Sequence, residues 1–481
     1  MTSQQQYLVL DNNEKISLSM ILELTSFDLY QTSRHYEVCQ DMARRVASNN
    51  EEEKFFTNIF SLKSKLARMA TALLFFIEMS EREVKELCIA PNLLDLLPPG
   101  VVKGVDVGQY NGKSEKNIPF SHIFKLIIKS LMHKVFRLFH RNRKKDVHAD
   151  ILVRGWVEVT EGLFPQEINK GLLCIYPFGF CGLRQIKFIR SCSKKKVNYI
   201  LAGLPYEIFP ILKDIISCIP AEFIMFNAEL KANRSHAKEL ASMSPRKIYS
   251  SDEYEAGVLF LYEELREAGV YIVNSAHGVG QYCPYICYSE FRVISQSQAD
   301  FYKLFNDNID YNIIEKKSSS LGIDDFQLSV KKNPAIVLIH QPFKESMLYA
   351  EDKVMHNLDI ELEKISTNLS IPYYIKMHPN YSRTLMRNNT FVGENVYEWD
   401  SLNEFRAVFV TINSTVYFEI KGVAPVFVYL APTFSPSLYF PGTFSTISQE
   451  NLEQNMSNMI NVDNWIEAAA RHAFGAGKAG D

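Results

Sequence analysis

A histidine followed by two glycines is the motif of this sequence best suited to chemistry. An apolar run at residues 271–273 predicts a short buried strand, and the strand leads into a loop that contains His277, Gly278, Gly280 and Tyr282. The carboxyl end of a strand is where an open α/β sheet presents reactive groups to a ligand. An imidazole there can act as a general base, whereas the structural alternative is a histidine that only fills the turn.

A second histidine, His378, ends a predicted strand at residues 373–377 and is followed by Pro379. The proline blocks further strand pairing and biases His378 toward an extended backbone, so its ring can point away from the sheet. This imidazole can hydrogen-bond a phosphate or donate a proton to a leaving group, and Lys376 adds positive charge nearby. The alternative interpretation is that His378 caps a turn.

A polar triplet, Asn413, Ser414 and Thr415, follows the predicted strand at residues 407–411 and precedes a short predicted helix. Ser and Thr are good N-caps, and hydroxyl and N–H groups at a helix N-terminus also form a phosphate site. The two interpretations are compatible. Glu419, one turn inside the helix, is placed to reach a ribose hydroxyl of a bound nucleotide.

Strands must position these motifs, and the chain from about residue 149 alternates predicted strands with helices. The predicted strands are residues 150–159, 172–176, 197–202, 221–226, 271–273 and 291–295 in a first series, and 335–339, 373–377, 407–411 and 423–429 in a second. This alternation predicts βαβ units and parallel sheets. The predicted fold class is therefore α/β, with two Rossmann-like domains whose polar strand ends face a cleft between them.

The remaining segments complete the predicted organisation. Apolar residues at helical spacing, without Gly or Pro, predict that residues 14–90 are helical. We expect a helical N-terminal region at 1–148, Rossmann-like domains at 149–310 and 311–470, and a disordered tail at 471–481. Asp252, Glu253 and Glu255 precede a predicted helix, and we expect them to be solvated acids that favour its dipole.

A basic segment at residues 119–145 stands apart from the rest of the N-terminal region. Its apolar stripe is accompanied by eight Lys and Arg residues and by no Asp or Glu. A basic amphipathic helix can lie on an anionic membrane surface. The alternative is a helix that packs on its own domain and keeps a solvated basic face.

Composition excludes several classes of protein. The 481 residues carry a net charge of -3, which is not that of a basic nucleic-acid binder. The eight cysteines form no C-x-x-C pair, so neither zinc nor a disulfide framework is indicated, and a reduced cytosolic protein is expected. No signal peptide and no membrane-spanning stretch is predicted.

In order and spacing, the three motifs resemble those of GT-B glycosyltransferases that build bacterial surface polysaccharides. From His277 to His378 are 101 residues, and from His378 to Ser414 are 36. The resemblance covers roughly residues 150–440. It extends to bacterial sialyl- and polysialyltransferases, capsule Kdo transferases and the CDP-polyol phosphotransferases of teichoic-acid synthesis.

The resemblance implies roles for the motif residues. His378 would contact the phosphate of a cytidine nucleotide donor, Ser414 and Thr415 would bind the same phosphate, and His277 would activate the acceptor hydroxyl. The implied nucleotide-binding residues are Lys376, Pro379, Asn413, Ser414, Thr415 and Glu419, and the implied active-site loop contains Gly278, Gly280 and Tyr282. The 149–310 domain would bind the acceptor and the 311–470 domain the donor.

We therefore expect a cytoplasmic enzyme, peripheral on the inner face of the membrane. It would transfer an acidic sugar from a CMP-linked donor, with inversion, to a glycan or lipid-linked acceptor of a capsule or lipopolysaccharide O-chain. No Asp-x-Asp motif stands out, so no metal or other cofactor is implied. Two alternatives stay open. One is a CDP-polyol phosphotransferase, because those enzymes share the His-Gly pair where the sialyltransferase-like families place two acids. The other is a non-catalytic nucleotide- or sugar-binding assembly protein.

Overall fold

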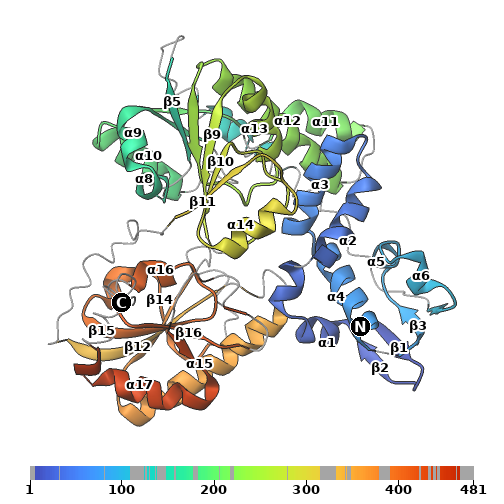
Figure 1. Ribbon diagram of the computed structural model, residues 1–481, viewed down its shortest axis with the longest axis vertical. Coiled ribbons are helices and arrows are strands. Elements are labelled where there is room, and N and C mark those ends of the chain that lie inside the picture. Colours follow the sequence, from blue (N-terminus) through green and yellow to red (C-terminus); the bar gives the residue numbers. More distant parts are fainter. Residues whose placement is uncertain are drawn as a thin grey trace, which may run out of the picture.

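The chain folds into two α/β domains and an N-terminal region that packs against both (Figure 1). The computed structural model describes residues 6–31, 33–80, 82–108, 124, 127–128, 130–135, 137, 148–155, 159–176, 183–204, 206–216, 221–278, 280–314, 332–341, 343, 348–378, 391–421, 424–431, 435–436, 440, 445–461 and 463–465. The predicted tail at 471–481 lies outside these residues.

The N-terminal region contains the helices predicted for residues 14–90 and, in addition, a small sheet that the sequence pattern did not indicate. Its helices are α1 (Leu18–Leu24), η1 (Phe27–Gln31), α2 (Ser33–Arg44), α3 (Asn50–Lys63), α4 (Lys65–Met79), α5 (Pro91–Leu94) and α6 (Pro99–Val102). Its strands are β1 (Tyr7–Leu10), β2 (Lys15–Ser17), β3 (Val84–Cys88) and β4 (Asp106–Val107), in the order β2-β1-β3-β4. The strands are short and flank the helical run, and β3 contains Lys and Glu, which are equally common in helices.

A parallel seven-stranded sheet forms the first Rossmann-like domain. Its strands are β5 (Ile151–Gly155), β6 (Leu172–Ile175), β7 (Tyr199–Leu201), β8 (Lys247–Ser250), β9 (Tyr271–Ser275), β10 (Glu290–Val293) and β11 (Asp310–Ile313). Its helices are α8 (Val159–Leu163), α9 (Pro165–Lys170), α10 (Leu183–Lys194), α11 (Ile208–Ile216), α12 (Ala221–Ala241), α13 (Val258–Glu267) and α14 (Gln296–Lys303). The order β11-β10-β9-β8-β5-β6-β7 reverses direction between β5 and β8, which is where such sheets bind ligands.

The prediction of a strand at residues 221–226 is wrong, because these residues begin the 21-residue helix α12. A short apolar run does not by itself distinguish a buried strand from a buried helix. Here Ile224 and Ala228, four residues apart on one helix face, pack together against Ile211 of α11. The strand next to β5 is β8, which the sequence pattern did not reveal.

A parallel six-stranded sheet forms the second Rossmann-like domain. Its strands are β12 (Asn333–Ile339), β13 (Tyr373–Lys376), β14 (Glu394–Val396), β15 (Phe405–Thr411), β16 (Val426–Tyr429) and β17 (Thr446–Ile447). Its helices are α15 (Tyr349–Leu369), η5 (Trp399–Leu402), α16 (Tyr417–Ile420), η7 (Gln449–Asn451) and α17 (Leu452–Ile460). The order β14-β13-β12-β15-β16-β17 reverses between β12 and β15, so both sheets confirm the predicted α/β fold with two Rossmann-like domains.

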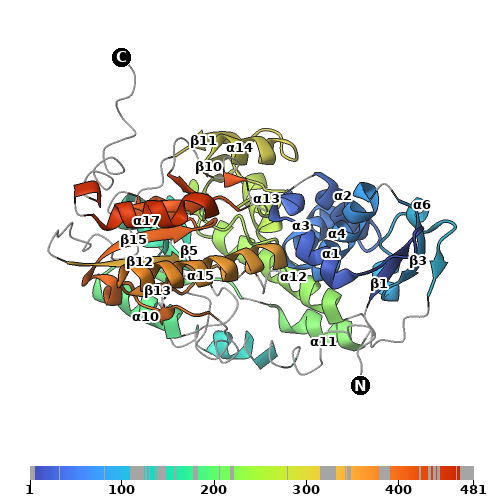
Figure 2. The ribbon, with the colours of Figure 1, turned by 90° about the horizontal axis from the view of Figure 1, so that it is seen from below.

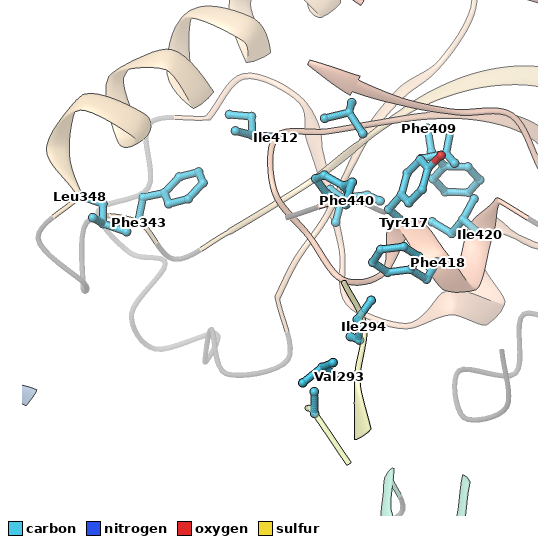
Figure 3. Packing of buried hydrophobic residues seen from close by; sticks show 14 of the residues in the cluster. Val293, Ile294, Phe343, Leu348, Phe409, Ile412, Tyr417, Phe418, Ile420 and Phe440 are labelled. Atoms are coloured by element: carbon cyan, nitrogen blue, oxygen red, sulfur yellow. The ribbon is translucent and has the colours of Figure 1, made fainter. Parts of the chain in front are cut away.

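One hydrophobic core joins the two sheets. The same cluster of buried residues includes strands of both domains, and Figure 3 shows Ile294, one residue beyond the end of β10, pointing toward Phe418 of α16. The N-terminal region adds further contacts, since α1 packs against α15 and the ring of Phe55 lies 5.3 Å from that of Phe260 on α13. Figure 2 shows the N-terminal helices beside both domains.

Candidate functional site

The turn after β9 places His277 beside an acid from the neighbouring strand. His277 lies two residues beyond the end of β9 and is half-buried. Its backbone N–H donates a hydrogen bond to the Glu253 carboxylate, and its ring centroid lies 4.8 Å from that of Tyr254. Both partners belong to the segment after β8, the strand next to β9. The turn that carries His277 is therefore held on one side by the segment after the neighbouring parallel strand.

The glycines of the turn allow close contacts that a larger residue would prevent. The carbonyl groups of Gly278 and Gly280 accept hydrogen bonds from the Gln298 amide on α14, at 3.0 and 2.8 Å. A Cβ atom on Gly280 would lie 2.8 Å from Cζ of Tyr282. One side chain of α14 therefore holds the turn, and the aromatic ring of Tyr282 closes over it.

The same turn meets the polar triplet of the other domain. A Cβ atom on Gly278 would lie 2.8 Å from Oγ1 of Thr415 and 3.2 Å from the hydroxyl oxygen of Tyr282. Gly278 follows β9 and Thr415 follows β15, so the carboxyl ends of both sheets approach each other at this point. The structure thus brings together the predicted loop residues Gly278 and Tyr282 with the predicted phosphate ligand Thr415.

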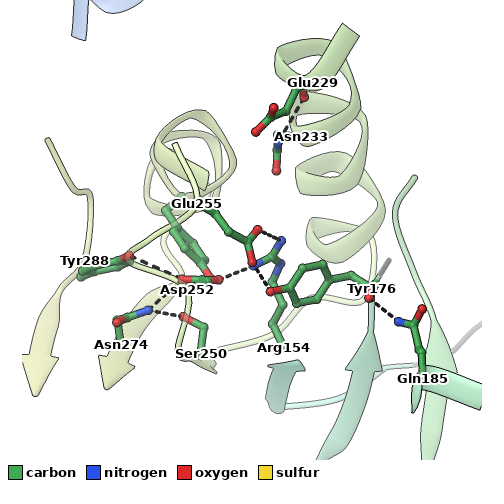
Figure 4. Close-up of polar contacts among 11 residues, drawn as sticks. Arg154, Tyr176, Gln185, Glu229, Asn233, Ser250, Asp252, Glu255, Asn274 and Tyr288 are labelled. Carbon is green, nitrogen blue, oxygen red and sulfur yellow. Dashed lines mark hydrogen bonds and ion pairs between the residues drawn. The ribbon is translucent and has the colours of Figure 1, made fainter. Parts of the chain in front are cut away.

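The acids that precede α13 are not solvated, and the prediction for them is wrong. Asp252 and Glu253 are buried, and Asp252 pairs with the buried guanidinium of Arg154 at the end of β5. Arg154 also lies 3.4 Å from Glu255, which accepts a hydrogen bond from the Tyr176 hydroxyl (Figure 4). These acids are not on a helix, because α13 begins only at Val258. They follow β8 and contact β5, so they lie where the sheet order reverses.

Further hydrogen bonds tie this acidic cluster to β9. Asn274 Nδ2 donates to Asp252 Oδ1 at 2.8 Å and to Ser250 Oγ at 3.0 Å. The Tyr262 hydroxyl on α13 donates to Asp252 Oδ2 at 2.5 Å. The cluster therefore links β5, β8 and β9 directly below the turn that carries His277.

Burial controls the charges in this cluster. Burial by itself lowers the pKa of the Arg154 guanidinium. The electrostatic interactions with Tyr176, Glu255 and Asp252 are together larger, and the net result is a raised pKa. Burial also raises the pKa of Glu255 to about 7, and it outweighs the opposing attraction of Arg154. Glu255 therefore changes protonation state near neutral pH.

The strand ends of the second domain carry two neutral histidines. Burial, helped by the charge of Lys376, lowers the pKa of half-buried His378 to about 4. Burial lowers the pKa of His340 to about 3, and the charges of His378 and His356 lower it further. His340 follows β12, beside the reversal of the sheet order, and His378 follows β13, so the two imidazoles lie on neighbouring strand ends.

The ammonium group of Lys376 is occupied by the protein itself. It donates to the backbone carbonyls of Tyr397 and Met377, at 2.8 and 3.1 Å, and lies 4.7 Å from the ring centroid of Trp399. Burial lowers its pKa to about 8. Pro379, the residue after His378, lies outside the described residues.

The polar triplet forms a tight turn before α16. The Ser414 N–H donates to Thr411 Oγ1 at 3.1 Å, and Ser414 Oγ accepts from the Val416 N–H at 3.3 Å. Ser414 and Glu419 are buried, whereas Asn413 is half-buried. Among the described residues, Asn413 Oδ1 has no hydrogen-bond partner, which leaves a buried acceptor in the triplet.

Comparisons with known proteins give similarity only at the level of structure. No family model matches the chain, and no curated protein matches it. Similar solved structures include MurG from Acinetobacter baumannii, with 9% identity, a TM-score of 0.37 and coverage of 67% of this chain and 94% of that chain. A trehalose-phosphate synthase (UDP-forming) from Burkholderia vietnamiensis is 10% identical, with a TM-score of 0.43 and coverage of 68% of this chain and 92% of that chain. A trehalose-6-phosphate synthase from a study of glycosyl transfer with retention is 9% identical, with a TM-score of 0.40 and coverage of 67% of this chain and 94% of that chain.

All three TM-scores lie below 0.5, so the fold assignment rests on the sheet orders and no reaction is carried over from these proteins. Within the described residues, no group of three or more His, Cys, Asp or Glu side chains could hold a metal ion. None of the described helices has the length and apolar character needed to cross a bilayer.

Proposed function

We propose that this chain is a glycosyltransferase that takes a nucleotide-activated sugar. The observation that carries the proposal is the contact between the Gly278 turn and Thr415, where the carboxyl ends of two Rossmann-like sheets meet. Reactive groups of such sheets lie at these ends, and two substrates held on opposite sheets can react at their junction. The acceptor binds to the first domain and the donor to the second.

In the proposed reaction, His277 accepts the proton of an acceptor hydroxyl. The acceptor oxygen then forms a bond to the anomeric carbon, the bond from that carbon to the donor phosphate breaks, and the sugar is transferred with inversion. Glu253, which accepts a hydrogen bond from the His277 backbone, positions the turn. It supplies the acid that the Ala276-His277 sequence lacks.

The donor side of the proposed site uses the strand ends after β13 and β15. His378 donates a hydrogen bond to the phosphate as a neutral imidazole, and the hydroxyls of Ser414 and Thr415 bind the same phosphate. Lys376 acts on the phosphate through its charge, because its ammonium already donates to two backbone carbonyls. Asn413 contributes its buried acceptor, Glu419 binds the ribose, and Pro379 shapes the strand end.

The motif resemblance supports a choice of substrates and of cellular location. The donor is a CMP-linked acidic sugar, and the product is part of a capsule or O-antigen glycan. The enzyme works at the cytoplasmic membrane surface, where residues 119–145 contact anionic lipid and the acceptor is lipid-linked or already part of a glycan.

A CDP-polyol phosphotransferase is the second candidate, and the His277-Gly278 pair favours it. In that reaction the acceptor oxygen attacks phosphorus, a polyol phosphate is transferred and CMP leaves. Both candidates release CMP, so donor screening with purified CMP-sugars and CDP-polyols separates them.

Nucleotide binding and two histidine variants test the proposal. CMP and CDP are expected to raise the melting temperature more than UDP and GDP do, and equal shifts would remove the cytidine assignment. His277→Ala should abolish transfer and keep nucleotide binding, whereas His378→Ala should weaken both. His148→Ala, at an exposed position three residues before β5, serves as the control. Turnover preserved in the His277 variant would exclude that residue as the base.

A further inference from the structure

Two short helices on the first Rossmann-like domain each have a packed face and an exposed apolar face. One is α11, and the other is the helix formed by the described residues between 124 and 137. The second helix packs on the first Rossmann-like domain, because Ser130 Oγ donates to the Tyr206 carbonyl at 3.1 Å and Arg137 donates to the Gly203 carbonyl at 2.9 Å. Ile127 completes this face by packing against the cluster that contains Ile211 of α11.

The opposite faces of these helices expose large apolar side chains, which we call the apolar ridge. Its members are Phe124, Ile128, Leu131, Met132 and Val135, which are 40–60% exposed, and Leu212, Phe209 and Ile216 of α11, which are 47%, 78% and 81% exposed. They make up eight of the 19 exposed large hydrophobic side chains among the described residues. In Figure 2 both helices lie along the lower margin of the molecule, with α11 labelled and the other drawn in cyan. Such clustering marks an interaction surface.

Charge identifies the partner of the apolar ridge. Residues 119–145, which contain five of the eight ridge side chains, carry eight Lys and Arg residues and no acid. Lys134 is exposed beside the ridge, whereas Arg137 pairs with Glu239. A second copy of the chain has the same positively charged sequence, so pairing two ridges would oppose like charges, Lys134 among them. An anionic bilayer offers a negative surface and an apolar phase together.

We propose that the apolar ridge docks the protein on an anionic lipid bilayer, with α11 inserted beside the basic helix. The sequence pattern pointed to residues 119–145 alone, and α11 adds the two most exposed members of the surface. The proposal extends the membrane location given above, but it does not depend on the transfer reaction. Because the ridge lies on the surface of the first domain, it would hold the proposed acceptor side toward the membrane.

Vesicle sedimentation with the full-length protein tests this proposal. We expect binding to vesicles of phosphatidylcholine with about 30% phosphatidylglycerol, and at least tenfold weaker binding to phosphatidylcholine alone. Phe209→Ser combined with Ile216→Ser should weaken binding to the anionic vesicles by at least tenfold. The control Leu304→Ser, which removes a 74% exposed leucine after α14, should leave binding unchanged.

Additional measurements on the same variants separate loss of membrane binding from misfolding and from loss of nucleotide binding. Circular dichroism shows that each variant is folded, and the melting shift with CMP reports the proposed nucleotide site separately. Equal vesicle binding by the ridge variant and the wild type would overturn the proposal. The proposal would also be overturned if the wild type did not bind vesicles and instead formed a dimer in sedimentation velocity, with the ridge variant a monomer.

Discussion

Glu255 lies at the centre of a charge balance that depends on pH. Burial raises the pKa of this carboxyl to about 7, from an unfolded value near 4.5. The folded protein therefore binds more protons than the unfolded chain between these two values. The contribution of Glu255 to the stability of the folded protein is therefore present at low pH and is lost as pH rises through about 7. His340 and His378, whose folded pKa values are lowered, act in the opposite direction at lower pH.

The variant Glu255→Gln isolates this contribution. The free energy of unfolding of the variant, minus that of the wild type, should increase by about 1–3 kcal/mol between pH 4.5 and pH 7. Urea unfolding at a series of pH values measures the difference. Glu267→Gln, which removes an exposed carboxylate of α13, corrects for the general effect of net charge. A difference that does not change with pH would show that Glu255 titrates alike in both states.

At the residue scale, the sequence predicted the groups on turns and missed the groups that support them. His277, Gly278 and Thr415 could be found because each follows an apolar run. Arg154 and Asp252 could not, since 98 residues separate them and only the strand order makes them neighbours. An arginine inside a predicted buried strand was the available signal, because a buried cation requires an acidic partner.

At the scale of elements, the contact between the turn after β9 and the turn before α16 can be measured. Gly278→Ala should destabilise the protein by about 1–3 kcal/mol, because the new methyl group would overlap Thr415 Oγ1. Thr415→Ala should recover part of this loss, with a coupling energy of about 0.5–2 kcal/mol in a double-mutant cycle. The matched control is Gly280→Ala with Thr415→Ala, since the Cβ at Gly280 meets Tyr282 instead. Additive effects in both cycles would mean that the two turns are not in contact.

Elements with a clear period were predicted, and those without one were not. The strands that lead to His277, His378 and Asn413 were found because each contains a short run of β-branched and aromatic residues that is followed by polar residues. The start of α12 was misassigned, since its first six residues have the length and apolar character of a strand. Short strands such as β8 and β11 become visible only through their pairing partners.

At the scale of the whole molecule, the shared core makes the two domains depend on each other. Ile294→Ala should speed hydrogen exchange not only in β10 but also in β15 of the other domain, because its side chain packs toward Phe418 on α16. The expected loss of stability is about 2–4 kcal/mol. Native-state exchange followed by mass spectrometry measures both strands.

Ile189→Ala provides the matched comparison. Ile189 belongs to a separate buried cluster that contains only residues of the first domain among those described. Its variant should speed exchange in β6 and leave β15 unchanged. If Ile294→Ala also leaves β15 unchanged, the two sheets open independently.

The indole of Trp399 lies close enough to Lys376 for its fluorescence to depend on that side chain. A positive charge 4.7 Å from an indole shifts the energy of its excited state, and the pKa of Lys376 near 8 places the loss of that charge in an accessible range. The emission colour of Trp399 therefore reports the charge state of the strand end that carries His378. A packing contact serves as a built-in fluorescent probe, and events at this strand end can be followed without any attached dye.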